Sequence, residues 1–425
     1  MVDALGHAPI RGVIARGLGR SYGDLAQNAG GLVLDMTGFR RILDFDREHG
    51  VVTVQSGCSL GRLIEECLPA GWFLPVTPGT RHVTVGGAIA CDVHGKNHHR
   101  DGSFGAWVLA LTLITPGGEL LRLTPSETPR RFWATVGGLG LTGVVLEATV
   151  QLLRVETPAV CVDVERTSDL DATLARLSES DDAYQYSVAW VDFAARANRF
   201  GRSVLIRGNH ARTEQLPARF EGLERLADGS RIVVPGWFSA ARLMRSPFPV
   251  LFNELYFRRA RDHEGAVKAL TGFFYPLDAV NNWNELYGRG GFLQYQFVLP
   301  FGAEETLKAV LRQVSAAGRP LLAVLKQFGP SAGPLSFPIP GWTVTLDMQL
   351  PAPELAHALD RADETIAAAG GRVYLAKDSR LRPKLLAEMY PSLDVWREVQ
   401  SELDPGERMH SDLARRLHVT GGRSV

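Results

Sequence analysis

The chain has 425 residues, 45% of them hydrophobic and 22% charged, with a formal net charge of +0. This balance excludes a disordered chain and a general nucleic-acid-binding protein, and the length predicts two or three domains at roughly 150 residues each. The N-terminus has no signal-peptide pattern, and no apolar run approaches the ~20 residues that span a bilayer. We therefore expect a soluble or peripheral protein.

Cysteine spacing indicates neither a metal site nor a disulfide framework. The four cysteines, Cys58, Cys67, Cys91 and Cys161, include no CxxC pair, and the histidines have no carboxylate or cysteine partners at ligand spacing. We expect buried thiols in a reducing compartment and no bound metal.

The first third of the chain predicts short strands punctuated by glycine. Strands are expected at 12–16, 31–36, 41–46 and 51–57. The "REHG" between the last two is typical of a hairpin turn, and the next segment predicts a helix that begins after Ser59 and ends at Gly71. A hairpin over 109–123, a short helix within 129–138 and a strand at 142–155 complete a strand-rich unit.

The middle of the chain predicts a second strand-rich unit. Strands are expected at 158–167, 186–193, 292–300, 321–329 and 342–350. Asp169 or Asp171 is expected to begin a helix, and Gly318 to end another. The last segment returns to a strand followed by helices.

The stretch "ARGLGRSYGD" follows an apolar strand and has glycine at positions 17, 19 and 23. This GxGxxxG spacing differs from the GxGxxG of a Rossmann turn, and "SYGDLAQNAGG" predicts turns where a dinucleotide fold needs a helix. Clustered glycines still allow backbone N–H groups to converge on an anion, so a phosphate cradle and a hairpin corner both remain open.

Two further glycine-rich stretches, 75–99 and 135–145, surround the same strands. Small residues let a backbone lie closely against a flat ligand. Three such turns around one unit predict a single long ligand lined by main chain.

Together, "ARGLGRSYGD", "PGTRHVTVGGAIACDVHGKNHH", "FWATVGGLGLTG" and "YLAKDSR" resemble the vanillyl-alcohol oxidase superfamily of FAD enzymes. "HGKNHH", "GFLQYQF", "SFPIPGW" and "AKDSR" resemble the subgroup that oxidises a polyprenyl-phosphate-linked ribose. The resemblance runs from residue 11 to "SDLARRL" and implies a two-domain α+β fold. An FAD-binding domain would comprise 1–157 and 372–425, with an antiparallel-sheet substrate domain, 158–371, inserted between them.

By this resemblance, the first loop holds the FAD pyrophosphate and the second runs along the ribityl chain and the isoalloxazine. The implied cofactor-binding residues are Arg16, Gly17, Leu18, Gly19, Arg20, Ser21, Gly79, Thr80, Thr84, Val85, Gly86, Gly87, Ala88, Ile89, Cys91, His94, Gly95, Val145 and Tyr374. Relatives with covalent flavin carry a histidine where this chain has Arg20, so the resemblance implies non-covalent FAD.

Oxidation of a secondary alcohol by a flavin needs a proton acceptor and positive charge near the flavin. The resemblance implies Lys377 as the essential residue, orienting the sugar hydroxyl and balancing flavin charge. It implies His94 as a proton acceptor, because imidazole titrates near neutral pH. The residues alone are also typical of an exposed polar loop at "HGKNHH", and we expect His98 and His99 to be exposed.

Alternation in "FLQYQF" places Gln294 and Gln296 on one face of a strand, which by itself predicts a solvent-facing stripe. The resemblance implies instead that these amides bind sugar hydroxyls and that a lysine meets the phosphate. The implied substrate-binding residues are Tyr22, Lys96, Trp190, Gln294, Gln296, Lys326, Thr343 and Thr345. Trp190 is equally typical of a core tryptophan.

The chain departs from the resemblance in two places. Relatives carry a cysteine, the site of covalent capture by nitro-aromatic inhibitors, at the position of Thr345, and an asparagine at the position of Thr343. Relatives also have roughly one further strand and helix before the first loop. We therefore expect either a shortened sequence or a different domain edge, with an effect on FAD retention.

The resemblance implies oxidation of decaprenylphosphoryl-β-D-ribose at the 2-hydroxyl. A separate NAD(P)H-dependent short-chain reductase would then complete epimerisation for arabinan synthesis at the cell envelope. Residues 229–262 mix aromatic residues with arginines and predict either a lid that meets prenyl chains and anionic lipid or an ordinary packed loop. A sugar-lactone or alditol oxidase and a non-catalytic scaffold that binds polyprenyl-phosphate sugars remain alternatives.

Overall fold

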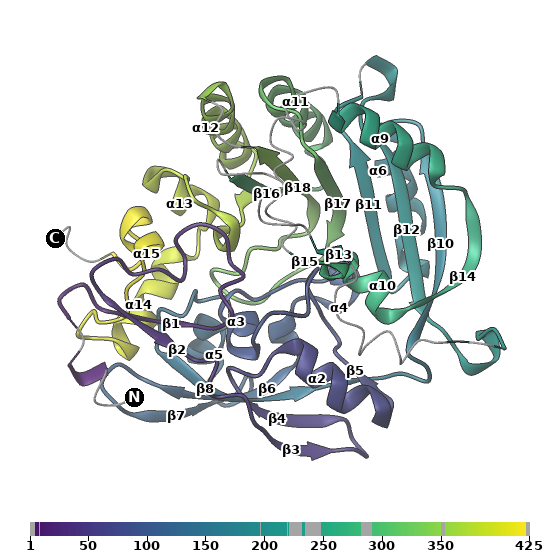
Figure 1. Ribbon diagram of the computed structural model, residues 1–425. Helices are drawn as coiled ribbons and strands as arrows, with labels where there is room; N and C mark the ends of the chain where they lie inside the picture. The colour runs from purple at the N-terminus through teal and green to yellow at the C-terminus, as the bar shows by residue number, and fades with distance from the viewer. Residues whose placement is uncertain are drawn as a thin grey trace.

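The computed structural model describes residues 5–7, 9–195, 197–218, 220, 232–233, 248–281, 291–349 and 353–421. The largest sheets in this part have five and eight strands, and every strand pair in them is antiparallel. Figure 1 shows the five-stranded sheet at the bottom of the molecule and the eight-stranded sheet at the upper right. The fold is therefore α+β, as expected.

The five-stranded sheet is built from the predicted hairpins. Its strands, in spatial order, are β3 (Ile42–Asp46), β4 (Val51–Gln55), β8 (Val144–Gln151), β6 (Val108–Ile114) and β7 (Leu120–Leu123). Gly50 N donates to Asp46 O and Thr115 N to Glu119 O, each at 2.9 Å, so both expected turns are confirmed. The helices beside this sheet are α2 (Leu60–Cys67), α3 (Val85–Ala90) and α5 (Pro129–Thr135), whereas α4 (His98–Asp101) contacts β17 (Leu322–Phe328) of the eight-stranded sheet.

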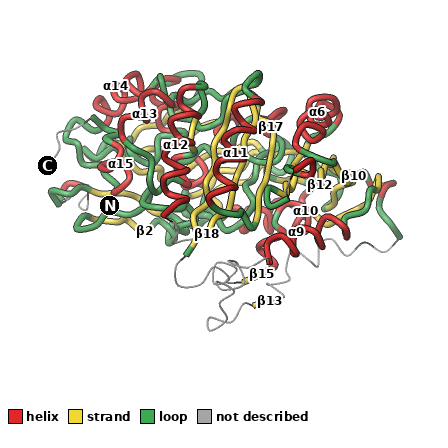
Figure 2. The backbone as a smooth tube through the Cα atoms, turned by 90° about the horizontal axis from the view of Figure 1, so that it is seen from above, coloured by secondary structure: helices red, strands yellow, loops and turns green. Residues whose placement is uncertain are grey.

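The eight-stranded sheet carries one face of the candidate site. Its order is β14 (His263–Ala269), β10 (Ala159–Thr167), β12 (Arg202–His210), β11 (Tyr186–Asp192), β17 (Leu322–Phe328), β18 (Gly341–Gln349), β16 (Phe292–Pro300) and β19 (Arg372–Val373). One face packs against α6 (Leu170–Ser180), α11 (Glu304–Ala317) and α12 (Pro353–Ala368), and Figure 2 shows α11 and α12 side by side. The opposite face is turned toward the glycine-rich loops. The helices at the outer end of the sheet are α9 (Phe248–Arg259) and α10 (Leu270–Phe274).

The C-terminal segment returns to the N-terminal unit, and Figure 1 shows yellow helices beside purple strands. Its elements are η8 (Leu375–Lys377), α13 (Pro383–Met389), α14 (Leu393–Leu403) and α15 (Asp412–Leu417). Met409 bridges to Val13, and Trp396 Nε1 donates to Ala134 O at 2.9 Å. The domain limits at 157 and 371 stay predictions.

Short elements complete the described part. They are β1 (Val13–Arg16) paired in parallel with β2 (Leu32–Asp35), β5 (Trp72–Phe73) with β9 (Leu153–Arg154), and β13 (Ile232–Val233) with β15 (Val280–Asn281). Residues 17–31, after the first glycines, form turns and no helix, as predicted.

Local signals at helix ends are confirmed. The Ser59 side chain accepts from Arg62 N at 3.1 Å, and Asp169 rather than Asp171 caps α6 by accepting from Ala172 N at 2.9 Å. Gly318 follows the last residue of α11.

Two expectations about the second glycine stretch are wrong. It is not all loop, because the Thr84 hydroxyl accepts from Gly87 N at 3.2 Å and begins α3. Neither His98 nor His99 is exposed. His98 Nδ1 accepts from Gly329 N at 3.1 Å and its Nε2 contacts Ser103 Oγ, and burial lowers its pKa to about 3. His99 is partly buried, and its Nε2 lies 3.1 Å from Tyr184 O.

Candidate active site

A cavity of about 810 Å³ lies between the glycine-rich loops and the open face of the eight-stranded sheet. It collects most of the residues that the sequence singles out, from segments as far apart as Arg16 and Lys377. Those in its lining are Arg16, Gly17, Leu18, Gly19, Arg20, Ser21, Tyr22, Gly79, Thr80, Thr84, Gly86, Gly87, Cys91, His94, Val145, Gln294, Gln296, Lys326, Thr345, Tyr374 and Lys377.

Other expected residues lie outside this lining. Three of them, Val85, Ala88 and Ile89, lie on the side of α3 that faces the core. The opposite side of the same helix turns Gly86 and Gly87 toward the cavity. Gly95 also lies outside the lining but reaches it indirectly, because its carbonyl accepts from Lys326 Nζ at 3.3 Å.

Three expected substrate residues also lie behind the cavity wall. Lys96 donates to Phe273 O and lies 4.4 Å from the centre of the Phe273 ring, and burial lowers its pKa to about 7. Trp190 packs on Tyr256 of α9, with ring centres 4.5 Å apart. Thr343 is buried beneath Gln296.

The first glycine loop lies directly against the start of α3. A Cβ on Gly17 would come 2.1 Å from Thr84 Oγ1, and Gly19 adopts a φ of +62°, which other residues rarely do. Because glycine has no side chain, the backbone N–H groups here can approach a ligand more closely than they could with any other residue. This is the geometry expected of a phosphate cradle.

On the sheet side, Gln296 fixes the orientation of His94. The Gln296 amide nitrogen donates to His94 Nε2 and to Thr343 Oγ1, each at 3.1 Å, while Thr343 Oγ1 donates to Phe297 O. Because Nε2 accepts, the ring proton lies on Nδ1. Burial, followed by the nearby cations Lys326 and Lys377, holds the pKa of His94 well below its usual 6.5, so the ring is neutral.

The cavity concentrates cations that burial makes less basic. Burial, then the charges of Lys377 and Lys96, lowers the pKa of Lys326 to about 7. Burial lowers the pKa of Lys377 to about 8, and Asp347 partly opposes that effect. Such a pocket favours a ligand that brings negative charge.

Asp347 is a site residue that the sequence analysis missed. It lines the cavity, accepts from Gln294 Nε2 at 2.6 Å and lies within electrostatic reach of Lys377 and Tyr22. The alternation that marks Gln294 and Gln296 marks Thr345 and Asp347 too, because these residues pair across β16 and β18. The signal was present in the sequence.

The residues present fit FAD. The backbone cradle suits a pyrophosphate, and Tyr374, stacked on Phe337 at 4.6 Å between ring centres, offers an aromatic wall with its hydroxyl bound to Cys91 O. His94 Nδ1 and Gln296 Oε1 are buried and find no hydrogen-bond partner among the described residues. Polar atoms in this state indicate a missing polar ligand.

The fold and this site define the chain as an FAD-dependent oxidoreductase. Residues 5–124 match the family described as "FAD binding domain". The chain is 43% identical over 414 residues to decaprenylphosphoryl-beta-D-ribose oxidase of Mycolicibacterium smegmatis, covering 96% of this chain and 90% of the relative. It belongs to the decaprenylphosphoryl-β-D-ribose oxidase family of FAD-linked oxidases.

Two other relatives define the range of the similarity. A Streptomyces coelicolor protein named "Uncharacterized protein in mprA 5'region" is 41% identical over 84% of this chain and 99% of its own length. L-gulono-1,4-lactone dehydrogenase of Mycobacterium tuberculosis is 31% identical over 43% of this chain and 41% of its own length. Similarity to the lactone enzyme is therefore partial.

Proposed function

We propose that this protein oxidises decaprenylphosphoryl-β-D-ribose at its 2-hydroxyl to the 2-keto sugar. One observation supports this proposal above all. A single cavity is lined by Lys377, by Lys326, Gln294 and Gln296 of the eight-stranded sheet, and by the first glycine loop. Similarity along 96% of the chain to an enzyme named for this substrate supports it.

Bound FAD supplies the two-electron acceptor. The first loop would hold its phosphates, and the second stretch, including Thr80 and Cys91, would run along the ribityl chain and the isoalloxazine, with Tyr374 completing the pocket. Lys377, as a cation, orients the sugar hydroxyl and offsets charge that develops on the ring. Gln294 and Gln296 bind sugar hydroxyls, and Lys326 meets the phosphate.

His94 takes the hydroxyl proton only after the Gln296 amide turns. In the observed arrangement Nδ1 carries the ring proton and is a donor. Turning the amide presents Gln296 Oε1 as an acceptor and so favours the tautomer with its proton on Nε2. The ring reaches that tautomer by releasing the Nδ1 proton to solvent and taking up another on Nε2, which leaves a lone pair on Nδ1. Thr343 resists this turn, because its hydroxyl accepts from the same amide.

Product analysis tests the proposal. The purified protein, loaded with FAD and given the prenyl-phosphoryl ribose and an artificial electron acceptor, is expected to yield a lipid two mass units lighter, which borodeuteride labels at C2. Unchanged substrate under conditions where FAD is bound would refute the proposed activity.

FAD is proposed to bind without a covalent bond, because Arg20 lines the cavity where relatives attach flavin through histidine. Acid precipitation should leave the flavin in the supernatant. Flavin that stays with the pellet would contradict this.

The keto product requires a reductase to complete epimerisation, and we propose a separate NAD(P)H-dependent short-chain enzyme as the partner. Adding such an enzyme with NADH should convert the keto lipid into the arabinose epimer. Return of ribose alone would contradict the assignment.

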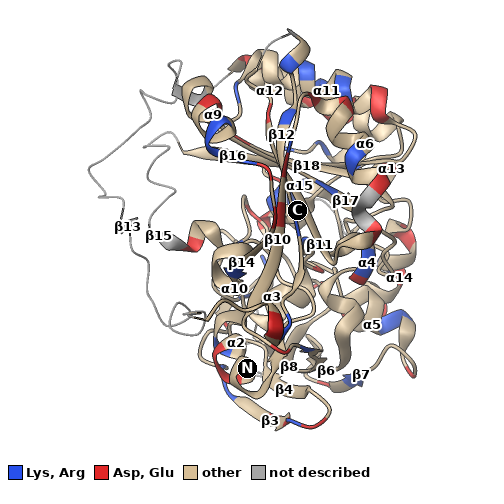
Figure 3. Cartoon of the chain, turned by 90° about the vertical axis from the view of Figure 1, so that its right-hand side faces the viewer, with Lys and Arg blue, Asp and Glu red and all other residues tan. Residues whose placement is uncertain are grey.

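Peripheral contact with a membrane at the cell envelope is also proposed. Residues 229–231 and 234–247 of the segment expected to be a lid or a packed loop lie outside the described residues, but α9 exposes Leu251 (66%) and Leu255 (49%) and ends with Arg258 and Arg259 (Figure 3). Apolar and basic groups together favour an anionic lipid surface. Among the described residues, no helix has the length and apolar character to cross a bilayer.

Liposome sedimentation tests this contact. A Leu251→Ser/Leu255→Ser variant should bind vesicles of anionic phospholipid more weakly than the parent, and Leu120→Ser, on exposed β7, should not change binding. Equal binding by all three proteins would end the proposal.

A further inference from the structure

The carboxylate of the residue after Lys377 accepts hydrogen bonds from three residues. Asp378 is buried, and its Oδ1 accepts from the backbone N–H groups of Arg380 and Leu381 at 3.0 and 2.8 Å. Its Oδ2 accepts from Arg416 of α15 at 2.8 Å. The position of the Lys377 backbone is therefore set by Asp378 and, through it, by Arg416.

Arg416 also forms a salt bridge with Asp24 of the first glycine loop. Its Nε and one terminal nitrogen donate to the two carboxylate oxygens of Asp24, each at 2.8 Å, and the same terminal nitrogen donates to Asp378. The two segments touch directly as well: Tyr22 N donates to Ala376 O at 2.9 Å. A Cβ on Gly23 would come 2.1 Å from the Asp378 carbonyl oxygen. One guanidinium thus joins the cofactor loop to the segment that carries Lys377.

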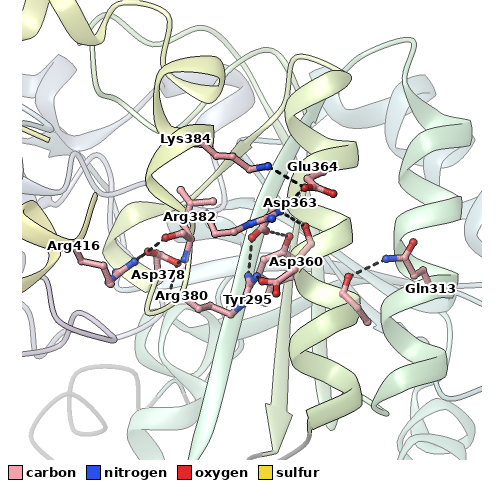
Figure 4. Close-up of polar contacts among 12 residues, drawn as sticks. Tyr295, Gln313, Asp360, Asp363, Glu364, Asp378, Arg380, Arg382, Lys384 and Arg416 are labelled. Atoms are coloured by element: carbon pink, nitrogen blue, oxygen red, sulfur yellow. Dashed lines mark hydrogen bonds and ion pairs between the residues drawn. The ribbon is translucent and has the colours of Figure 1, made fainter. Parts of the chain in front are cut away.

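The other side of this segment is fastened to the eight-stranded sheet. Figure 4 shows Arg380 directed at Asp363 of α12, which also receives the Tyr295 hydroxyl at 2.7 Å. Tyr295 stands between Gln294 and Gln296 on β16. The sheet side is therefore held by contacts that do not involve Arg416, whereas the loop side is held by Arg416 together with the Tyr22–Ala376 hydrogen bond.

We infer that Arg416 is a positioning residue for Lys377, which it holds at a fixed place relative to the first glycine loop. The inference rests on the role proposed above for Lys377. Arg416 does not line the cavity, so it acts through Asp378 and Asp24 and not on a ligand.

Arginine suits this position because its planar guanidinium can donate to two carboxylates at once. Burial alone would lower the pKa of Arg416, but pairing with Asp24 and Asp378 outweighs burial and raises it. Lysine would keep the charge but has one nitrogen on a flexible stem. An Arg416→Lys variant therefore separates charge from geometry.

The same helix offers a matched control. Arg415 and Arg416 both have 26% of the side chain exposed, and both pair with carboxylates. Arg415, however, contacts Asp412, Asn28 and the Arg11 carbonyl, and neither Asp24 nor Asp378. Arg415→Lys should reproduce any general effect of loosening α15.

The first measurement uses the protein without added flavin. Competitive acetylation across pH, read by mass spectrometry on the peptide around Lys377 and compared with exposed Lys384, gives the pKa of Lys377. We expect about 8 in the parent and in Arg415→Lys. In Arg416→Lys we expect a rise of about one unit, because Lys377 leaves its buried position. Asp347, Lys326, His94 and Tyr22 surround Lys377 and are unchanged in all three proteins.

The second measurement is flavin bleaching by substrate, per bound flavin. Arg416→Lys should lower the rate at saturating substrate by at least about tenfold while the substrate concentration at half-saturation stays within about twofold, because the sheet contacts remain. Asp378→Asn should reproduce this loss, and adding it to Arg416→Lys should cost little more, because both variants break one contact.

Outcomes separate the two proposals. If the parent does not bleach with the ribolipid, the proposed function fails, and the acetylation result still decides the positioning role. If Arg416→Lys leaves the pKa of Lys377 unchanged, or if Arg415→Lys shifts it equally, Arg416 has only a structural role and the inference is wrong.

Discussion

At the scale of single residues, the cavity holds two lysines whose pKa values burial lowers and a neutral histidine fixed by an amide. The charge state of Lys377 is the property most directly connected to turnover. Below about pH 8 the side chain is a cation, and above that it loses its proton.

Lys377→Met should therefore retain FAD yet reduce the rate of substrate oxidation by about 10² to 10⁴. In the parent the rate should fall as pH rises through about 8, because the cation that orients the hydroxyl disappears. The measurement is the pH profile of flavin bleaching. A parent rate that rises through pH 8, or a variant with full activity, would show that the lysine cation is not required.

Thr345 permits a second test at this scale. It lines the cavity and pairs with Gln296 across the strands, but a hydroxyl is a poor nucleophile beside a thiolate. After turnover with a nitro-aromatic inhibitor, intact mass should show an unmodified parent and an adduct on Thr345→Cys. An adduct on Thr345 itself would contradict this account.

At the scale of elements, the sequence pattern predicts which segments carry the site residues. It does not predict which of those residues a helix turns toward the cavity or which are buried behind its wall. Glycine spacing excluded a Rossmann turn, and no helix follows the first loop. The glycines of the second stretch predict a turn, yet Thr84 caps the helix α3 there, although glycine disfavours helices. Lys96 sits two residues from His94 but turns away from the cavity, which residue type alone does not reveal.

The close approach of the first loop to α3 predicts the effect of one methyl group. Gly17→Ala would force Thr84 to move and should weaken FAD binding by at least about tenfold, roughly 1.4 kcal/mol. Gly38→Ala is the control, because an added Cβ there meets nothing within 4 Å. Fluorescence titration measures both. Equal affinity in the two variants would mean that the loop does not cradle the cofactor.

At the scale of the whole molecule, the site exists only where separate parts of the chain meet. The first and second glycine-rich stretches, three strands of the eight-stranded sheet and the C-terminal segment each contribute, and hydrogen bonds such as that from Gln296 to His94 cross between them. Which distant segments of the chain lie side by side depends on the topology of the fold, which local sequence patterns do not specify. The expectation that these segments share one site came from the family resemblance and not from hydrophobic periodicity.

A ligand bridging these parts should stabilise them together. FAD at 100 times its dissociation constant should add about 2.7 kcal/mol to the free energy of unfolding. Denaturant melts followed by tryptophan fluorescence and by circular dichroism should shift by the same amount. A shift in one signal only would indicate that the parts unfold independently.

Anaerobic mixing of the FAD-loaded protein with candidate substrates tests the assignment of the ribolipid as substrate. Decaprenylphosphoryl-β-D-ribose should bleach the visible flavin bands, while L-gulono-1,4-lactone and free alditols at the same concentration should not. Bleaching by the lactone or an alditol but not by the ribolipid would contradict this assignment.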